Sequence, residues 1–264
     1  MYEMEFTGAE SKMNDDIRIT IDKHFVATVE ICKPPNNFFS NDLISGLADT
    51  FEELDTNDGV RVSIICSQGK HFCAGADFSS KSKGNDTLGL YAGAVRIFRC
   101  RKPIVAAIQG AAIGGGLGLA LVADFRIASP EARFSANFAR LGFHQGFGLS
   151  VTLPELIGPQ ASRDMFFTGK RVKGEEALRI GLCDKIVPID NLREATLSYA
   201  RNIAKSAPLA VEAIRETLRG DLADRVEKAT LHEGKEQARL IKTKDWSEGI
   251  AASAERRDPK FERK

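Results

Sequence analysis

The first part of the chain carries two different periodicities of apolar residues. Over residues 17–31, apolar and polar residues alternate on either side of Asp22-Lys23, which predicts two strands joined by a tight turn. After Ser40, an expected N-cap, apolar residues recur at helical spacing over 41–55, and a β-rich stretch follows at 59–67. The pattern therefore predicts a β-α-β order.

The middle of the chain continues this alternation. We expect helix, strand, helix and strand in turn over 88–100, 104–110, 117–124 and 125–129. Buried strands that alternate with helices pack as a parallel sheet, so the predicted fold class is α/β. Beyond Gly142 the pattern changes to long amphipathic stretches that predict a helical extension, at 190–206, 208–219 and 221–242.

Composition narrows the class of protein. The 264 residues are 43% hydrophobic and 28% charged, with a net charge of +1, so we expect a globular protein with no electrostatic preference for nucleic acid or an anionic membrane. Five cysteines without paired short spacings predict reduced thiols and no metal site. The polar, acidic first residues lack the features of a signal peptide, which predicts a cytoplasmic protein.

Two glycine-bearing stretches each follow a predicted strand: "HFCAGADF" at 71–78 and "GAAIGGGLGLA" at 110–120. Glycines after a strand often serve only to turn the chain or to let a helix pack closely. A phosphate-binding loop is excluded, because no Lys-Ser/Thr pair follows and no acidic ribose partner stands about 20 residues on. Two loops with small side chains leave backbone N–H groups bare, and such groups can stabilise an oxyanion on a carbonyl oxygen.

Four blocks together resemble the crotonase superfamily, the enoyl-CoA hydratase/isomerase family. Besides "HFCAGADF" and "KPIVAAIQGAAIGGGLGLALVADFRIAS", they are "FFTGKRVKGEEALRIGLCDKIVP" and "DWSEGIAASAERRDPKF", and the likeness covers about residues 17–262. The resemblance implies a spiral of β-β-α units over 1–196 and a helical trimerisation region over 197–264. It also implies homotrimers or dimers of trimers, and acyl-CoA thioesters as substrates, with coenzyme A as part of the substrate and no other cofactor.

Carried over by position, the resemblance implies that the backbone N–H groups of Ala76 and Gly115 form the oxyanion hole. It further implies contacts to the acyl-CoA from residues around these loops: Asn36, Ala74, Asp77, Phe78, Ser79 and Phe138. Simpler interpretations stay open for several residues. Asn36 and Asn37 also fit an ordinary turn, Asp77 and Asp124 fit caps of a loop and a strand end, and the basic end with Arg257, Lys260 and Lys264 fits a solvated tail.

The chain departs from the family at the acidic positions. The resemblance implies that hydratases carry glutamates where this chain has Gly118 and Phe138, and that some isomerases and dehalogenases carry an aspartate at Gly146. None of these three residues transfers a proton, so we expect very low crotonyl-CoA hydration. Phe138 makes the acyl site drier and better suited to apolar or aromatic groups. Isomerisation, hydrolysis and decarboxylation remain open, as does a non-catalytic acyl-CoA-binding protein.

The best candidate for a proton carrier is His144, in the stretch that also contains Asn137, Arg140 and Gln145. An imidazole with a pKa near 6.5 suits acid-base work at neutral pH. A histidine that only binds a loop or a neighbouring subunit fits the same position. Other polar residues carry less weight as catalytic groups: His24, His71, Cys73 and the exposed Glu131.

Overall fold

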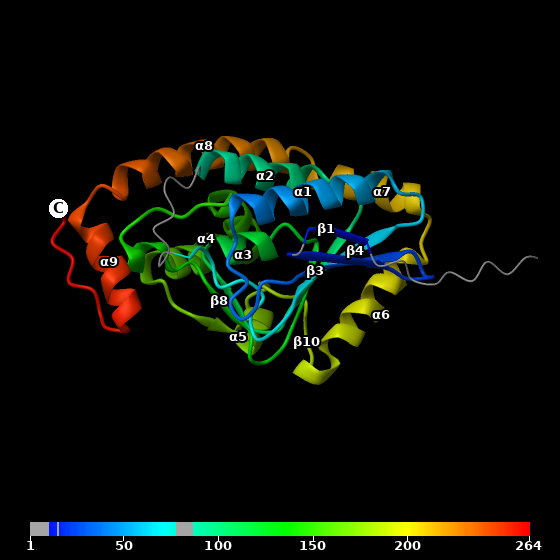
Figure 1. The fold of residues 1–264 in the computed structure, drawn as a ribbon, viewed down its shortest axis with the longest axis horizontal. Helices are drawn as coiled ribbons and strands as arrows, with labels where there is room; N and C mark the ends of the chain where they lie inside the picture. Colours follow the sequence, from blue (N-terminus) through cyan, green and yellow to red (C-terminus); the bar gives the residue numbers. More distant parts are fainter. Residues whose placement is uncertain (1–10, 15, 78–86) are drawn as a thin grey trace, which may run out of the picture.

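A large sheet forms the centre of the molecule in the computed structural model, which describes residues 11–14, 16–77 and 87–264 (Figure 1). Within these residues the sheet has seven strands in the order β1-β2-β3-β4-β5-β7-β10. The first three pair antiparallel and the others are added in parallel. Their bounds are Ser11–Asn14, Ile17–Ile21, Val26–Ile31, Val62–Ser67, Ile104–Ile108, Phe125–Ala128 and Lys185–Ile186.

A second sheet of three short strands lies beside the first: β6 (Ala111–Ile113), β8 (Arg133–Ser135) and β9 (Val172–Lys173). The chain visits the two sheets in turn. It passes from β5 to β6 and then into the helix α3 (Gly115–Ala120), and again from β7 to β8 and then, through the 3-10 turn η1 (Asn137–Leu141), into α4 (Leu149–Thr168). The expected spiral of β-β-α units is thereby confirmed.

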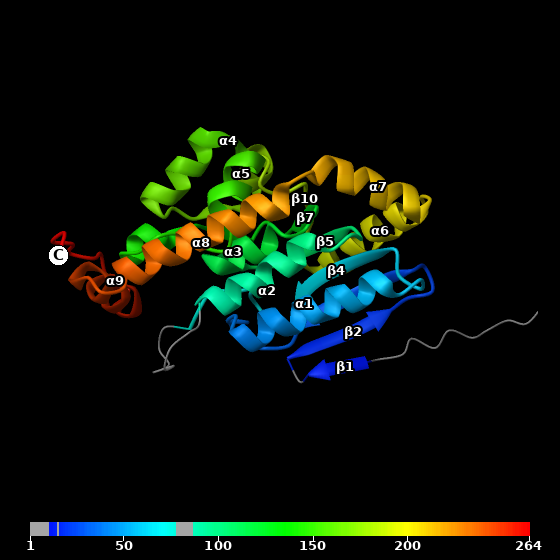
Figure 2. The same cartoon turned by 90° about the horizontal axis from the view of Figure 1, so that it is seen from above.

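Three helices cover one face of the large sheet and lie side by side (Figures 1 and 2). They are α1 (Asn41–Thr56), α2 (Thr87–Arg99) and α8 (Leu222–Leu240). Ser40 caps α1 as predicted, because its side chain accepts a hydrogen bond from the Leu43 N–H. The apolar sides of these helices and the sheet enclose the main core. The opposite face is covered by α6 (Leu192–Ala204), which buries Leu192 and Ala200 in a second core cluster.

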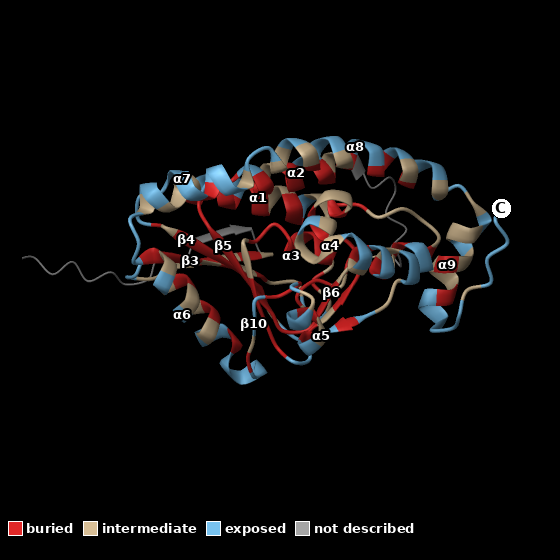
Figure 3. Ribbon diagram, turned by 180° about the vertical axis from the view of Figure 1, so that it is seen from behind, coloured by how far each residue is buried: buried red, intermediate tan, exposed pale blue. Residues whose placement is uncertain are grey.

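The C-terminal part is helical, as predicted, and the boundary expected between residues 196 and 197 falls inside α6. The remaining elements of this half are α5 (Gly174–Arg179), η2 (Ile189–Asn191), α7 (Pro208–Arg219) and α9 (Lys244–Glu255). The outer part of α7 is exposed (Figure 3), and the helix carries three exposed apolar residues, Leu209, Ile214 and Leu218, which are 78%, 58% and 81% exposed. Ile214 and Leu218 stand one turn apart on the same side of the helix. Its inner side carries Arg215, which is buried.

Among the residues that the structure describes, no helix combines the length and the apolar character needed to cross a membrane. Within the same residues, no group of three or more His, Cys, Asp or Glu side chains is placed to hold a metal ion.

Candidate active site

The two glycine-bearing loops lie against each other. Cys73 pairs with Ala112 in a parallel bridge, where the Cys73 N–H donates to the Ala111 carbonyl and the Ile113 N–H donates to the Cys73 carbonyl, at 2.9 and 3.1 Å. On the other side, the Phe39 N–H donates to the Gly75 carbonyl at 3.1 Å. The first loop is thus fixed between residue 39 and strand β6.

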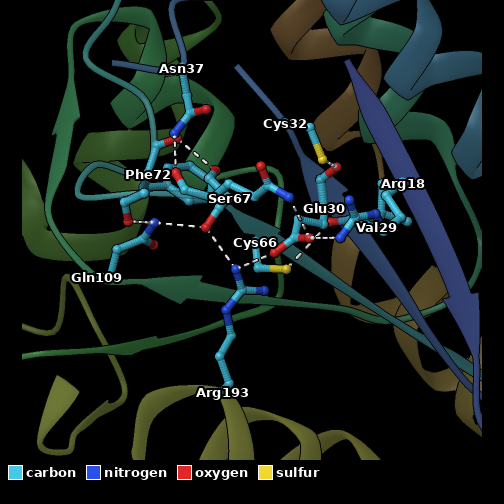
Figure 4. A network of polar contacts seen from close by, with 12 residues as sticks. Arg18, Val29, Glu30, Cys32, Asn37, Cys66, Ser67, Phe72, Gln109 and Arg193 are labelled. Atoms are coloured by element: carbon cyan, nitrogen blue, oxygen red, sulfur yellow. Dashed lines mark hydrogen bonds and ion pairs between the residues drawn. The ribbon is translucent and has the colours of Figure 1, made fainter. Parts of the chain in front are cut away.

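Buried amide side chains hold the turn that leads into the first loop (Figure 4). Asn37 Nδ2 donates to the carbonyls of Gln68 and His71 at 2.8 and 2.6 Å. Gln109 Nε2 donates to the Ser67 carbonyl at 2.9 Å. Asn37 therefore serves the turn itself. The backbone of its neighbour Asn36 supports the loop as well, because the Asn36 carbonyl accepts from the Ala74 N–H at 2.9 Å.

Close packing explains why glycines stand in the second loop. A Cβ on Gly116 would collide with the Cys73 carbonyl, and one on Gly115 would collide with the Phe39 ring. Gly115 is the first residue of α3, so its N–H has no acceptor within that helix. The Ala76 N–H has no hydrogen-bond partner among the described residues. Close packing therefore explains the glycines, and the same two loops still present backbone N–H groups that have no partner among the described residues.

A cavity of about 790 Å³ opens beside both loops, and its lining includes Ala74, Ala76, Gly115 and Phe138. The structure thus brings four of the predicted substrate-binding residues together. Much of the remaining wall is aromatic, from Phe39, Phe143, Phe147 and Trp246. Of the described residues that line the cavity, none carries a carboxylate. Its polar side chains come from Tyr91, Asn137, Lys235, Gln237 and the indole of Trp246.

The three positions at which the resemblance implies acids in other family members are closed by bulky groups. A Cβ on Gly118 would lie 2.6 Å from the Cβ of Phe147, which is fully buried. Phe138 packs edge-on against Phe143, with ring centroids 5.3 Å apart. A Cβ on Gly146 would collide with the Tyr91 hydroxyl. The described lining residues therefore include no acid, and at Gly118 and Gly146 the packing leaves no room for one in this arrangement.

His144 is placed apart from this cavity, since it is not among the lining residues. Its Nδ1 lies 2.8 Å from the Gln145 carbonyl, and its ring stands edge-on to His232 on α8 at 5.7 Å. Of its neighbours, Asn137 lines the cavity, whereas Arg140 pairs with Asp258 at 2.6 Å. The structure does not bring His144 together with the two loops.

Other predicted polar residues have structural surroundings. His71 Nδ1 accepts from the Ala111 N–H at 3.4 Å, and burial, with the nearby Arg133 and Lys70, lowers its pKa. Cys73 is fully buried, and burial raises the pKa of its thiol to about 12, which leaves it protonated and unreactive. Asp77 ends a described segment, so the predicted contacts of Phe78 and Ser79 lie outside the described residues.

Asp124 caps a strand, as the simpler interpretation has it. Its carboxylate accepts from the Ile104 N–H at 2.8 Å and pairs with Arg215 and Arg219 of α7, at 2.8 and 2.9 Å. Burial opposes the charge, but the two guanidinium groups hold the pKa of Asp124 below its usual value.

The basic end lies at the surface of the single chain. Arg257 is exposed and pairs with Glu248 and Glu255 at 2.5 and 2.6 Å. Lys260 and Lys264 are exposed as well. None of these three residues lines the cavity beside the glycine loops.

Several cavity residues escape prediction from sequence. Tyr91 comes from α2, Gln237 from α8 and Trp246 from α9, so residues far apart in the chain form one wall. The periodicity of each helix marks its buried side and says nothing about which buried residue meets a cavity. The one available signal is the glycine at 146, which makes room for the Tyr91 hydroxyl.

The spiral of β-β-α units and the paired glycine loops define a crotonase-type acyl-CoA enzyme. The chain belongs to the enoyl-CoA hydratase/isomerase family, whose model matches residues 22–264. It is 32% identical to the carnitinyl-CoA dehydratase of Proteus mirabilis (strain HI4320) over 246 residues, covering 89% of this chain and 94% of the relative. It is also 32% identical to the enzyme of that name from Salmonella arizonae, over 94% of this chain and 99% of the relative.

Solved structures agree on the fold. The crystal structure of an enoyl-CoA hydratase/isomerase from Pseudoalteromonas atlantica T6c superposes with a TM-score of 0.84 at 29% identity. The superposition covers 94% of this chain and all of that one. The chain is therefore an enzyme of the lyase or isomerase class that acts on acyl-CoA thioesters.

Proposed function

We propose that the enzyme stabilises the enolate of an acyl-CoA thioester between the backbone N–H groups of Ala76 and Gly115. The observation that carries the proposal is that both residues line one cavity and that their amides have no hydrogen-bond partner among the described residues. Each donor that meets a developing oxyanion in a dry site contributes about 2.7–4 kcal/mol to transition-state stabilisation. The aromatic wall supports this function, because it excludes water and strengthens both hydrogen bonds.

The first candidate reaction is decarboxylation of a malonyl-type thioester. When the bond between Cα and the carboxylate breaks, CO₂ leaves and the electrons of that bond form the enolate, so no base is required. The enolate then takes a proton at Cα from water to give the product thioester. The absence of a carboxylate among the described lining residues favours this reaction. Coenzyme A enters the proposal only as part of the substrate, and no further cofactor is invoked.

The second candidate reaction is dehydration of a hydroxyacyl-CoA. The observation that favours it is the name of the relatives, carnitinyl-CoA dehydratase, at 32% identity. Dehydration removes a proton from Cα before the hydroxyl leaves, and it therefore needs a base. The lining residues that the structure describes supply no carboxylate for that step.

Two measurements test the proposal. Incubation with malonyl-type, carnitinyl and crotonyl thioesters, read by mass spectrometry, distinguishes loss of CO₂, loss of water and gain of water. Infrared spectroscopy of a bound, isotopically labelled thioester tests the oxyanion hole without turnover, since two hydrogen bonds lower the carbonyl stretching frequency. Ala76→Pro removes one donor and is expected to reverse part of that shift. An unshifted carbonyl in the wild type contradicts the proposal, and binding without any turnover favours a non-catalytic family member.

The assembly is also part of the proposal. We propose a homotrimer or a dimer of trimers, in which another copy covers the exposed apolar side of α7. That side exposes Ile214 and Leu218 to water in the single chain. Burial of apolar surface contributes about 25 cal/mol per Å², which makes association favourable.

A further inference from the structure

Among the described side chains that line the cavity beside the glycine loops, only that of Tyr91 carries a hydroxyl group. We infer that this hydroxyl selects the acyl group, by accepting a hydrogen bond from a hydroxyl that the substrate carries. The inference rests on the proposed function, because it assumes that the acyl chain occupies this cavity. It names the substrate class as a bulky, apolar acyl thioester with one hydroxyl group.

The hydrogen bonds around Tyr91 decide which partner it can take. Its O–H donates to Gln237 Oε1 at 2.8 Å. The Gln237 amide cannot be reversed without loss, because its Nε2 donates to the His144 carbonyl at 2.9 Å. A phenol oxygen both donates and accepts, so with its proton on Gln237 the Tyr91 oxygen is left to accept from a donor such as a substrate hydroxyl.

The Tyr91 hydroxyl is held at the cavity as a neutral group. Burial raises the pKa of Tyr91, and the nearby Glu233 carboxylate adds to that effect. Glu233 is itself fully buried and accepts from the N–H groups of Gly148 and Ser150 at 2.9 and 3.0 Å. Its carboxylate is therefore committed to the start of α4, and Tyr91 offers the substrate a neutral acceptor.

The surroundings of Tyr91 fit a bulky apolar acyl group. Phe143 lies edge-on to both Phe138 and Trp246, with ring centroids 5.3 and 4.6 Å apart. Such rings gain by contact with alicyclic or aromatic groups. The cavity volume of about 790 Å³ lies within the range of small-molecule sites.

The test compares the dissociation constants of three CoA esters that share one cyclohexane ring: unsubstituted, ring-hydroxylated and ring-oxidised to the ketone. The wild type is expected to bind the hydroxy ester about tenfold more tightly than either of the others. Its hydroxyl donates a hydrogen bond to the buried Tyr91 oxygen, whereas the other two esters leave that acceptor without a donor. Tyr91→Phe is expected to remove this preference. Tyr199→Phe is the matched control, since Tyr199 lies on α6, packs against Phe125 of β7 and is not part of the cavity lining.

A second variant tests whether the Tyr91 hydroxyl acts as a hydrogen-bond acceptor or only as a polar group. Gln237→Leu removes the acceptor of the Tyr91 proton, so the hydroxyl becomes free to donate, and the preference is expected to move toward the ketone ester. Thermal unfolding and circular dichroism confirm that each variant folds. Equal binding of the three esters by the wild type, or an unchanged preference in Tyr91→Phe, overturns this inference alone. No binding of any ester overturns the proposed function and the inference together.

Discussion

At the scale of single residues, Gly118 is the position where side-chain size has the clearest effect. Alanine in place of glycine within a helix ordinarily adds stability, by up to about 1 kcal/mol. Here the new Cβ would lie 2.6 Å from that of Phe147. We expect Gly118→Ala to destabilise the protein by about 1–3 kcal/mol, the usual cost of overpacking. Urea unfolding measures the change.

The Phe147→Gly background provides the control for this prediction. Once both the Cβ and the ring of residue 147 are removed, Gly118→Ala should cost much less, which gives a double-mutant cycle with a clear coupling energy. An equal cost in both backgrounds would contradict the steric explanation. The same geometry predicts that Gly118→Glu alone yields no hydratase, because the glutamate side chain has no space at that position.

The sequence predicts single residues well where local chemistry decides their role. Ser40 caps α1 and Asp124 caps a strand end, as their residue types and positions indicate. Tyr91 could not be predicted, because its role depends on Gly146 and Gln237, which reach it only through the packing of α2 and α8. His144 is a residue type suited to proton transfer, but its place depends on tertiary structure, which puts its ring against His232 and not in the cavity lining.

At the scale of elements, Asp124 ties α7 to the sheet through Arg215 and Arg219, which are 8% and 15% exposed. Asp124→Asn would leave both guanidinium groups without their counter-charge. We expect a loss of about 3 kcal/mol in the free energy of unfolding, near the lower end of the cost of breaking a buried pair. Denaturant unfolding at neutral pH measures it.

The pH dependence of this prediction has a definite sign. The pKa of Asp124 is lowered in the folded state, from an ordinary value of 3.8, so its stabilising effect is complete above that value. The effect is lost as the pH falls through the folded pKa, and the gap between wild type and Asp124→Asn should narrow there. Asp258→Asn is the control, because Asp258 is 91% exposed and its loss should change stability little.

Prediction of the elements succeeds for long periodic segments and for the short strand at 125–129, and it misses the shortest strands. The helices at 41–56, 87–99 and 208–219 lie close to the expected ranges. Strands β8, β9 and β10, of two or three residues each, were outside the reach of pattern analysis, because so few residues carry no period. The change of sheet between β5 and β6 depends on pairing with distant segments, and no local signal contains it.

At the scale of the whole molecule, the outer side of α7 predicts association. Leu218 is 81% exposed in the single chain. We expect the wild type to sediment as a trimer or a multiple of it, and Leu218→Asp to shift the population toward smaller species, because a buried charge without a partner opposes association. Analytical ultracentrifugation measures the mass.

Glu216→Lys is the matched control on the same helix, since it alters charge at an exposed position that is already polar. It should leave the assembly largely intact. A monomeric wild type, or an unchanged assembly in Leu218→Asp, would show that another copy does not cover this side of α7.

Residues of α8 and α9 close the cavity, and this affects how the chain folds while it is being synthesised. Lys235, Gln237 and Trp246 line the cavity, and Glu233 of α8 caps the start of α4. A ribosome delivers these residues long after Phe39 and the two glycine loops. Until then, a nascent chain presents its aromatic wall to water, as a surface that chaperones and other nascent chains can bind. A message cut short before codon 246 would therefore yield an aggregating product rather than a weakened enzyme.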